Sequence, residues 1–343
     1  MNIEVINPLS CPGWDDLLLA SEKNSFFHTS GWAKVLHESY GYTPLYFTSI
    51  RDSKLATLIP MMEVKSIITG KRGVSLPFTD HCEPVVMDKD SFNDAVAQIR
   101  KFGRKRRWNY IEWRGGSEHF KSVTPSLSFY SHDLKLNSDE DNLFSALKSN
   151  TKRNIKKARK EGVKINLHNS VDSMRQFFSL NCITRKKHGL PPQPFSFFKR
   201  LFENIISKKK GIIALAYFKK RVIAGAVFLH FNKKAVYKYG ASDENYLKVR
   251  PNNLLMWESI RYYAKNDYNN FSFGITETGN QGLLQFKRGW GGTESTINYY
   301  RYSLKNKDFI KDSFRIKTSY SIFKKMPTPL LNAVGTLLYR HIG

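Results

Sequence analysis

Two hydrophobic periods alternate along this chain, and together they predict a mixed α/β protein. Apolar residues recur every three to four positions in 30–41, 91–107 and 252–267, which is typical of helices with one buried face. Aromatic-rich segments at 109–114 and 270–274 predict strands. Three further apolar runs, separated by short polar turns, predict an antiparallel meander: GIIALAYF, RVIAGAVFLHF and AVYKYGAS. We therefore expect mostly antiparallel mixed sheets flanked by helices.

The order of elements is repeated in the two halves of the chain. Residues 100–116 (RKFGRKRRWNYIEWRGG) and 261–279 (RYYAKNDYNNFSFGITETG) both run from a helix end into an aromatic-rich strand and then a glycine-bearing loop. This similarity of topology predicts two copies of one α/β unit. We expect domains at 1–135 and 136–304, followed by a segment, 305–343, that returns to the first domain or to a membrane surface.

The last segment ends in a predicted amphipathic helix. Pro329 suits the first turn of a helix, and apolar side chains follow on one helical face, at Leu330, Leu331, Val334, Leu337 and Leu338. Lysine, arginine and histidine flank this face. We expect the helix either to pack on the first domain or to lie as an anchor on the inner leaflet of a membrane.

Charge and cysteine content narrow the classes of partner and compartment. The 343 residues include 55 Lys and Arg against 29 Asp and Glu, a net charge of +26, which favours polyanionic partners such as nucleic acids, phosphorylated substrates or anionic membranes. Three widely spaced cysteines fit a reducing compartment, and the N-terminus does not resemble a signal peptide. The longest apolar run, 222–231, is too short to span a bilayer. The expected location is the cytoplasm, with peripheral attachment to the inner membrane as an alternative.

A run of seven basic residues and no acidic one lies between residues 148 and 160. On a helix these side chains form one contiguous face, opposite Ile155 and Ala158. The run is either a solvated surface helix or a wall that faces a phosphate. Arg153, in the first turn, is the best phosphate ligand because its planar fork matches the anion. Two neighbours on the same face would assist it, Lys152 and Lys156.

A glycine-rich segment, 273–292, combines six glycines with cationic and aromatic residues. It predicts a short helix from about residue 280 to 288, with Phe286 and Trp290 in the core. The helix would present three polar side chains, Gln285, Lys287 and Arg288. A cation beside such a loop can hold a phosphate or stabilise the oxyanion of an acyl transfer.

A third group of polar residues lies between the meander and the helix that follows it. Tyr239 and Asn253 are expected to point into the space between them. Asp243 either caps a turn or orients a substrate amine. No G-x-S-x-G elbow, Walker loop or H-E-x-x-H motif is present, and no Cys/His cluster has the spacing of a zinc site. We therefore expect neither a metal partner nor histidine-based acid–base chemistry.

Three segments in this order resemble the FemAB-like branch of the GNAT acyltransferase superfamily: TKRNIKKARKEGV, YGASDENYLKVRPNNLLMWE and FGITETGNQGLLQFKRGWG. This branch contains the peptidoglycan-bridge aminoacyltransferases and the acetyltransferase-like proteins of exopolysaccharide synthesis. The resemblance covers most of the chain and implies two tandem GNAT-like domains. It also implies transfer of an acyl or aminoacyl group to a primary amine. The lysine of its F-K-x-G-[FW] motif, Lys287 here, lies at the reaction centre, and Arg153 is the expected ligand of the acceptor's diphosphate.

The resemblance implies no tightly bound cofactor, with aminoacyl-tRNA, acyl-CoA or an acyl carrier protein as donor substrate. The usual pyrophosphate loop of CoA-dependent GNAT enzymes, R/Q-x-x-G-x-G/A, is replaced by Arg250-Pro-Asn-Asn-Leu-Leu, which lacks the glycines and disfavours acetyl-CoA. Nothing resembles the helical-hairpin insertion of some bridge enzymes.

The resulting hypothesis is an N-acyltransferase or aminoacyltransferase acting on an amine of a cell-envelope precursor, either a peptidoglycan peptide or an exopolysaccharide aminosugar. In it Lys287 and Arg288 are catalytic. The residues 152, 153, 156, 239, 243, 253 and 285 bind substrate. The expected partners are a phosphorylated or lipid-linked precursor, tRNA and the inner membrane surface. The alternative is a non-catalytic nucleic-acid-binding protein or polysaccharide-assembly scaffold.

Overall fold

The computed structural model describes residues 3–21, 23–87, 89–311 and 321–343, and the chain divides into two compact units. The first unit contains Met1–Phe129, Thr296–Ile316 and Leu338–Gly343, and the second contains Tyr130–Ser295 and Lys317–Leu337. These units differ from the predicted linear division at 135/136 and 304/305. The difference arises because a strand from late in the sequence joins the sheet of the first unit, and local sequence patterns do not specify non-local strand pairing.

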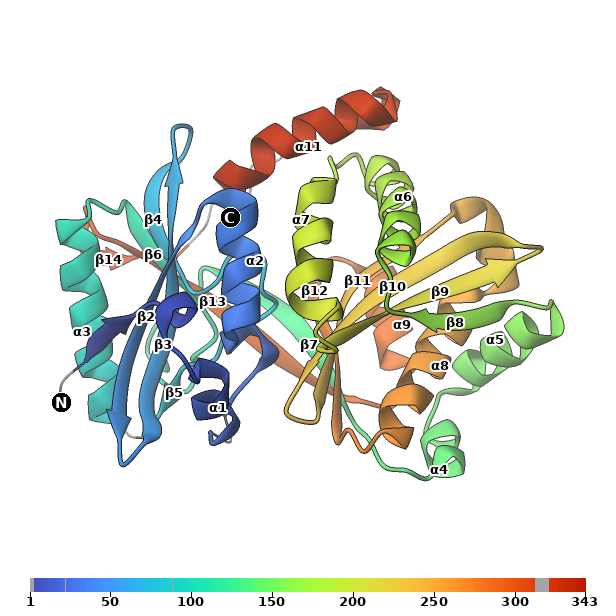
Figure 1. The fold of residues 1–343 in the computed structure, drawn as a ribbon, viewed down its shortest axis with the longest axis horizontal. Coiled ribbons are helices and arrows are strands. Elements are labelled where there is room, and N and C mark those ends of the chain that lie inside the picture. Colours follow the sequence, from blue (N-terminus) through green and yellow to red (C-terminus); the bar gives the residue numbers. More distant parts are fainter. Residues whose placement is uncertain (1–2, 22, 88, 312–320) are drawn as a thin grey trace. The chain divides into compact units, whose positions relative to one another are not determined.

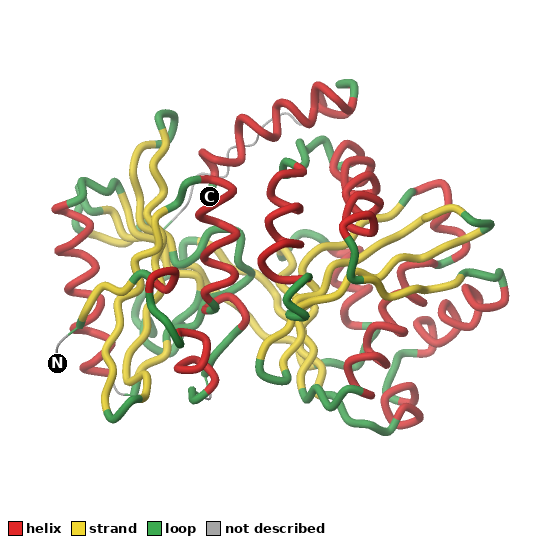
Figure 2. Tube along the Cα trace, viewed as in Figure 1, coloured by secondary structure: helices red, strands yellow, loops and turns green. Residues whose placement is uncertain are grey.

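The first unit is built on a mixed sheet with the strand order β1-β2-β3-β4-β6-β13 (Figures 1 and 2). Neighbouring strands in this sheet pair antiparallel, except β4 and β6, which run parallel. A short strand, β5 (Val85–Val86), pairs with β3. The other strands are β1 (Glu4–Ile6), β2 (Thr43–Arg51), β3 (Lys54–Ser66), β4 (Gly70–Val74), β6 (Tyr110–Arg114), β13 (Thr293–Ser303) and β14 (Asp308–Phe309), which pairs with β13.

Helices cover both faces of this sheet, with α3 (Lys89–Lys105) on one side and α1 (Trp14–Leu19) and α2 (Ser30–Tyr40) on the other (Figure 1). The α2 helix begins at Thr29, whose side chain accepts a hydrogen bond from the backbone of Trp32, and ends at Gly41 in the left-handed region. The predicted helix at 91–107 is α3, and it begins two residues before the expected cap at Ser91.

Residues from the end of the chain belong to the first unit. Helix α11 (Thr328–Ile342) carries Tyr339, whose carbonyl accepts a hydrogen bond from Tyr42 Oη at 3.0 Å. The guanidinium of Arg72, only 2% exposed, donates to the carbonyls of His341 at 2.8 Å and Gly343 at 2.9 Å.

The apolar face predicted for this helix is only partly buried. Leu331 is fully buried, whereas Leu330 and Leu337 are exposed. Over the described part of the chain, no helix is both long enough and apolar enough to cross a membrane.

The second unit has the strand order β8-β9-β10-β11-β12-β7. The predicted meander is confirmed as β9, β10 and β11, which pair antiparallel, and β11 runs parallel to β12. The strands are β7 (Leu127–Lys135), which begins in the first unit, β8 (Lys164–His168), β9 (Gly211–Phe218), β10 (Arg221–Phe231), β11 (Lys234–Ser242) and β12 (Asn270–Glu277).

The helices of the second unit again cover two faces, with α6 (Val171–Lys187) and α7 (Phe195–Leu201) opposite α5 (Ser149–Lys160) and α8 (Pro251–Lys265) (Figure 1). The unit also contains three short helices, α4 (Glu140–Ser145), α9 (Gln281–Arg288) and α10 (Ser321–Lys325). One apolar core lies between the sheet and α5 and α8, around Trp257, Tyr263 and Trp290. Phe286 packs against this core, so both aromatic residues of the glycine-rich segment lie where they were expected.

The predicted repeat of topology is confirmed at the level of elements. In the first unit α3 precedes β6, which pairs parallel with β4. In the second unit α8 precedes β12, which pairs parallel with β11. Each unit therefore contains a parallel pair that follows a helix, and the pair in the second unit places its candidate site.

Candidate functional site

The parallel pair β11 and β12 separates soon after it begins. Its ladder runs only from Lys234–Asn270 to Val236–Ser272, whereas β11 continues to Ser242 and β12 to Glu277. The partner on the other side, β10, stays paired with β11 up to Ser242. Ligands of α/β proteins bind at the carboxyl ends of parallel strands, where the chain leaves the sheet. The side chains that meet β12 beyond residue 272 therefore form the candidate site.

Lys287 meets β12 directly beyond the end of this ladder. Helix α9 begins at Asn280, whose side chain accepts a hydrogen bond from the backbone of Leu283 at 3.2 Å. In its last turn Lys287 is 3% exposed, and its ammonium donates to the carbonyls of Gly274 at 2.9 Å and Ile275 at 3.1 Å. A buried cation requires such acceptors, and here they hold it beside the separated strands.

A second polar atom lies in the same part of β12. The side chain of Thr276 is 2% exposed, and its hydroxyl has no hydrogen-bond partner among the described residues. Buried hydroxyls are almost always hydrogen-bonded, so an unpaired one often marks a position where a ligand or water completes the bonding. Lys287 and Thr276 together make this segment of β12 the most polar buried region of the glycine-rich motif.

Arg288 has different surroundings from its neighbour. Its guanidinium donates two hydrogen bonds to the carboxylate of Glu294, at 2.6 and 2.8 Å, and lies over the ring of Tyr130. The catalytic role expected for Arg288 therefore stays a prediction. Its fork is occupied by the carboxylate of Glu294, with which a substrate contact would compete.

Glu294 also contacts a buried histidine that the sequence analysis missed. His132, 1% exposed, lies on β7 with its Nε2 2.8 Å from Glu294. The hydrogen bonds from Arg288 hold the pKa of Glu294 at about 2, well below its ordinary value. Burial lowers the pKa of His132, although Glu294 raises it. No local pattern marks His132 and Glu294, because 162 residues separate them and only strand pairing brings them together.

The basic run is confirmed as helix α5, with Ile155 and Ala158 fully buried on one face. Arg153 and Lys156 are exposed, as a phosphate-contacting role requires. Lys152 is half-buried and donates to the carbonyl of Ser145 at 2.7 Å, so its expected phosphate contact competes with a local one. The basic run contains no acidic residue, but a carboxylate of α8 balances part of its positive charge. Glu258 accepts a hydrogen bond from Arg159 at 2.9 Å.

The basic helix and the glycine-rich motif are in direct contact. The backbone N–H of Lys148 donates to the carbonyl of Gly289 at 3.0 Å. A Cβ on Gly289 would lie 2.4 Å from the hydroxyl of Thr151, and a Cβ on Gly291 would lie 2.8 Å from the carbonyl of Ala146. These two glycines therefore permit close packing of α9 against the start of α5. The structure brings two of the three predicted groups together.

The third group lies differently from the prediction. The ladder between β10 and β11 contains a bulge, in which Val227 pairs with Tyr239 and Phe228 with Tyr237, so that Lys238 is extra. The bulge turns the two tyrosines to opposite faces. Tyr237 packs into the core beside α8, whereas the ring of Tyr239 lies 5.4 Å from Phe198 of α7. The expectation that Tyr239 points toward α8 is wrong.

The remaining predicted residues have mostly local roles. The carboxylate of Asp243 accepts from the backbone of Asn245 at 3.0 Å and so caps a turn, which is the first of the two roles proposed for it. Asn253 lies half-buried in the first turn of α8, and Gln285 is exposed on α9. Of these three, Gln285 shares an element with Lys287.

Comparison with known proteins finds a family match within the second unit. Residues 145–288 match the family described as "Acetyltransferase (GNAT) domain". A curated relative, the lipid II:glycine glycyltransferase of Staphylococcus epidermidis, is 31% identical over 75 residues. This match covers 20% of the present chain and 18% of the relative.

Solved structures resemble the chain over most of its length. A crystal structure of FemX has a TM-score of 0.69 at 12% identity, covering 87% of this chain and 97% of that one. A tandem GNAT protein from the clavulanic acid biosynthesis pathway has a TM-score of 0.57 at 8% identity and covers 88% and 98%. L-PGS from Bacillus licheniformis has a TM-score of 0.55 at 12% identity and covers 97% of both chains. These likenesses confirm the predicted fold of two tandem GNAT-like units.

Proposed function

Because the chain carries a GNAT acyltransferase domain within a FemX-like tandem fold, we propose that it transfers an aminoacyl or acyl group to a primary amine of a cell-envelope precursor. The observation that carries this proposal is the ammonium of Lys287, buried against the carbonyls of Gly274 and Ile275 where β12 has left β11. The relative named as a lipid II:glycine glycyltransferase supports an aminoacyl donor and a lipid-linked acceptor.

In the proposed reaction the acceptor amine attacks the acyl carbon of the donor ester. A carbon–nitrogen bond forms, an oxyanion develops on the former carbonyl oxygen, and the bond to the donor's alcohol oxygen then breaks. The proton of the amine passes to the leaving oxygen. Lys287 would stabilise the oxyanion, because a fixed cation in a buried site acts more strongly than one in water.

The acceptor's phosphates are proposed to lie along the exposed face of α5. Arg153 and Lys156 project from this face, and the first turn of α5 packs against the end of α9 that carries Lys287. A phosphate held at the start of α5 would lie near the end of α9, because Lys148 contacts Gly289 there. Arg153→Gln should therefore raise the KM for the acceptor more than it lowers kcat.

Transfer of a radiolabelled aminoacyl group from bulk charged tRNA to lipid II tests the proposal. Wild-type protein should transfer label, and Lys287→Met should reduce turnover by about 10²–10³-fold, the usual effect of removing an oxyanion donor. Gly282→Ala, on the exposed start of the same helix, is the matched control. Thermal unfolding of each variant separates loss of chemistry from loss of fold.

Two results would contradict the proposal. Full turnover by Lys287→Met would remove this lysine from the mechanism. Absence of transfer by the wild-type protein from charged tRNA, acyl-CoA and acyl carrier protein, together with salt-sensitive binding of uncharged tRNA, would favour the non-catalytic nucleic-acid-binding alternative.

A further inference from the structure

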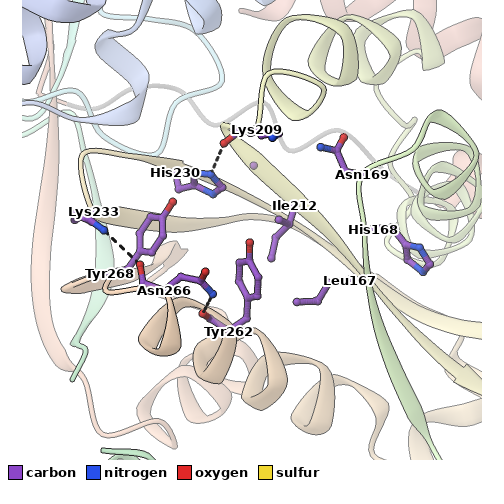
Figure 3. Close-up of a pocket in the computed structure, with 11 residues that line it drawn as sticks. Leu167, His168, Asn169, Lys209, Ile212, His230, Lys233, Tyr262, Asn266 and Tyr268 are labelled. Carbon is purple, nitrogen blue, oxygen red and sulfur yellow. Dashed lines mark hydrogen bonds between the residues drawn. The ribbon is translucent and has the colours of Figure 1, made fainter. Parts of the chain in front are cut away.

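A cavity lies in the second unit, at the end of the sheet where β11 and β12 begin. Its volume is about 530 Å³, within the range of small-molecule sites. Four segments surround it: the end of β8, the loop before β9, the turn between β10 and β11, and the last turn of α8 (Figure 3). Lys287 contacts β12 at its other end, so the cavity is separate from the candidate acyl-transfer site.

One wall of the cavity is aromatic and held in place by its own contacts. His230 Nε2 donates to the carbonyl of Lys209 at 2.8 Å (Figure 3). This leaves Nδ1 to accept from the hydroxyl of Tyr263 at 3.1 Å. Burial lowers the pKa of His230, which agrees with this neutral form. The ring of Tyr268 lies 5.2 Å from His230 and 4.9 Å from Tyr263. The wall is therefore fixed before any ligand binds.

The opposite side of the cavity is formed by the ring of Tyr262 and by two apolar side chains, Ile212 and Leu167. Tyr262 projects from α8 toward Ile212 and Leu167 (Figure 3). A ring of similar size, aromatic or saccharide, can pack between such surfaces. The amide of Asn169 lies at the edge of the same space and can hydrogen-bond the polar groups of a ring.

The rim of the cavity is cationic. Lys209 and Lys233 lie on two different turns, and both are exposed. Among the described residues neither forms an ion pair with a carboxylate, and no Asp or Glu lines the cavity. The Nζ of Lys233 is 3.5 Å from the carbonyl of Asn266, which is a weak contact. Two uncompensated ammonium groups beside an aromatic cavity favour a ligand that carries a phosphate.

From this combination we propose that the cavity binds the phosphate ester of a ring compound. The ring would pack against Tyr262 and the wall of His230 and Tyr268, and the phosphate would lie between Lys209 and Lys233. Sugar phosphates and nucleotides share this chemistry, and the experiment separates them. The proposal does not depend on the acyl-transfer activity.

Isothermal titration of the full chain at moderate salt tests the site directly. The probes are hexose 1- and 6-phosphates in one arm and nucleoside monophosphates in the other, with glucose and inorganic phosphate as partial ligands. One arm should bind saturably and at least ten-fold more tightly than either partial ligand, because ring and phosphate are recognised together. The arm that binds identifies the source of the ligand.

Variants assign the binding to this cavity. Lys209→Gln with Lys233→Gln should weaken it at least ten-fold, and Tyr262→Ala should weaken it more than Tyr262→Phe. The control, Lys219→Gln with Lys220→Gln, removes the same charge from the turn between β9 and β10. Equal weakening by the control, binding no tighter than that of inorganic phosphate, or no binding by either arm would overturn the proposal.

Discussion

Lys287 and Arg288 are neighbours in sequence, yet their side chains meet different chemistry. Lys287 is buried against two backbone carbonyls, whereas Arg288 is partly exposed and paired with Glu294. The difference arises because successive residues of a helix point about 100° apart. Only one of two adjacent cations can therefore face the separated strands β11 and β12. The sequence motif alone does not show which of the two cations is buried.

Replacement of Glu294 by glutamine tests the ion-pair cluster at the level of one residue. Glu294 raises the pKa of His132 against the lowering effect of burial, so Glu294→Gln should lower the pKa of His132 further. Titration of the imidazole resonances by NMR measures this change. His168, whose lowered pKa is caused by burial alone, serves as the reference and should not move. An unchanged or raised pKa of His132 would mean that the contact is absent in solution.

A buried carboxylate in the first unit predicts a pH-dependent stability. Burial raises the pKa of Glu63, but hydrogen bonds from Arg106, Trp108 and Lys65 outweigh it and hold the pKa at about 2, below its ordinary 4.5. A depressed folded-state pKa contributes stability above the ordinary value, and this contribution is lost as the pH falls from 4.5 toward 2.

Glu63→Gln should therefore cost roughly 2 kcal/mol of unfolding free energy near pH 7, a value reduced for the partial exposure of Arg106. The difference in unfolding free energy between the variant and wild type should shrink as the pH falls below 4.5. Urea unfolding at several pH values between 7 and the acid range measures this difference. Glu38→Gln removes a carboxylate whose lysine partner is 3.8 Å away at the surface, and should cost less than about 0.5 kcal/mol. A pH-independent difference for Glu63→Gln would contradict the assignment.

At the scale of elements, the candidate site depends on the fit between α5 and α9. The two helices are 120 residues apart, and each was predicted from its own periodicity. Their contact requires the absence of a side chain at Gly289, because a Cβ there would meet Thr151. The bulge at Lys238 is a second feature that depends on how elements pair, since it turns Tyr239 away from α8.

Gly289→Ala should disturb this fit and cost roughly 1–3 kcal/mol, the usual range for an overpacked contact. Gly282→Ala lies on the same helix with nothing within 4 Å of the added methyl, so it should be neutral or stabilise by roughly 0.5–1 kcal/mol. Thermal unfolding compares the two. Adding Thr151→Ala to Gly289→Ala should recover part of the loss, and strict additivity of the two changes would argue against this contact.

At the scale of the whole molecule, distant parts of the chain complete each unit. The first unit takes β13 and the last six residues from beyond the second, and Arg72 is buried against carbonyls of that terminal segment. A buried guanidinium that loses its acceptors is strongly destabilising.

Removal of residues 338–343 should therefore destabilise the first unit by roughly 2–4 kcal/mol. Hydrogen exchange should report faster exchange in β4, which carries Arg72, than in strands β9 and β10 of the second unit. Leu337→Ala changes an exposed side chain of the same helix and should have little effect. Uniform acceleration of exchange in both units would contradict this local role.

The sequence by itself determined the type and approximate limits of α2, α3, α5, α8 and α9, the meander and the repeated order of elements. Each of these follows from local periodicity, caps and turns, which are properties of neighbouring residues. It also marked Lys287 and Arg153 as candidate site residues, since each lies in a continuous motif. Tertiary structure alone decided which sheet β13 joins, which face Tyr239 occupies, which cation of the motif is buried and where His132 meets Glu294. These depend on strand pairing and helix packing between segments far apart in the chain, and no local pattern encodes that geometry.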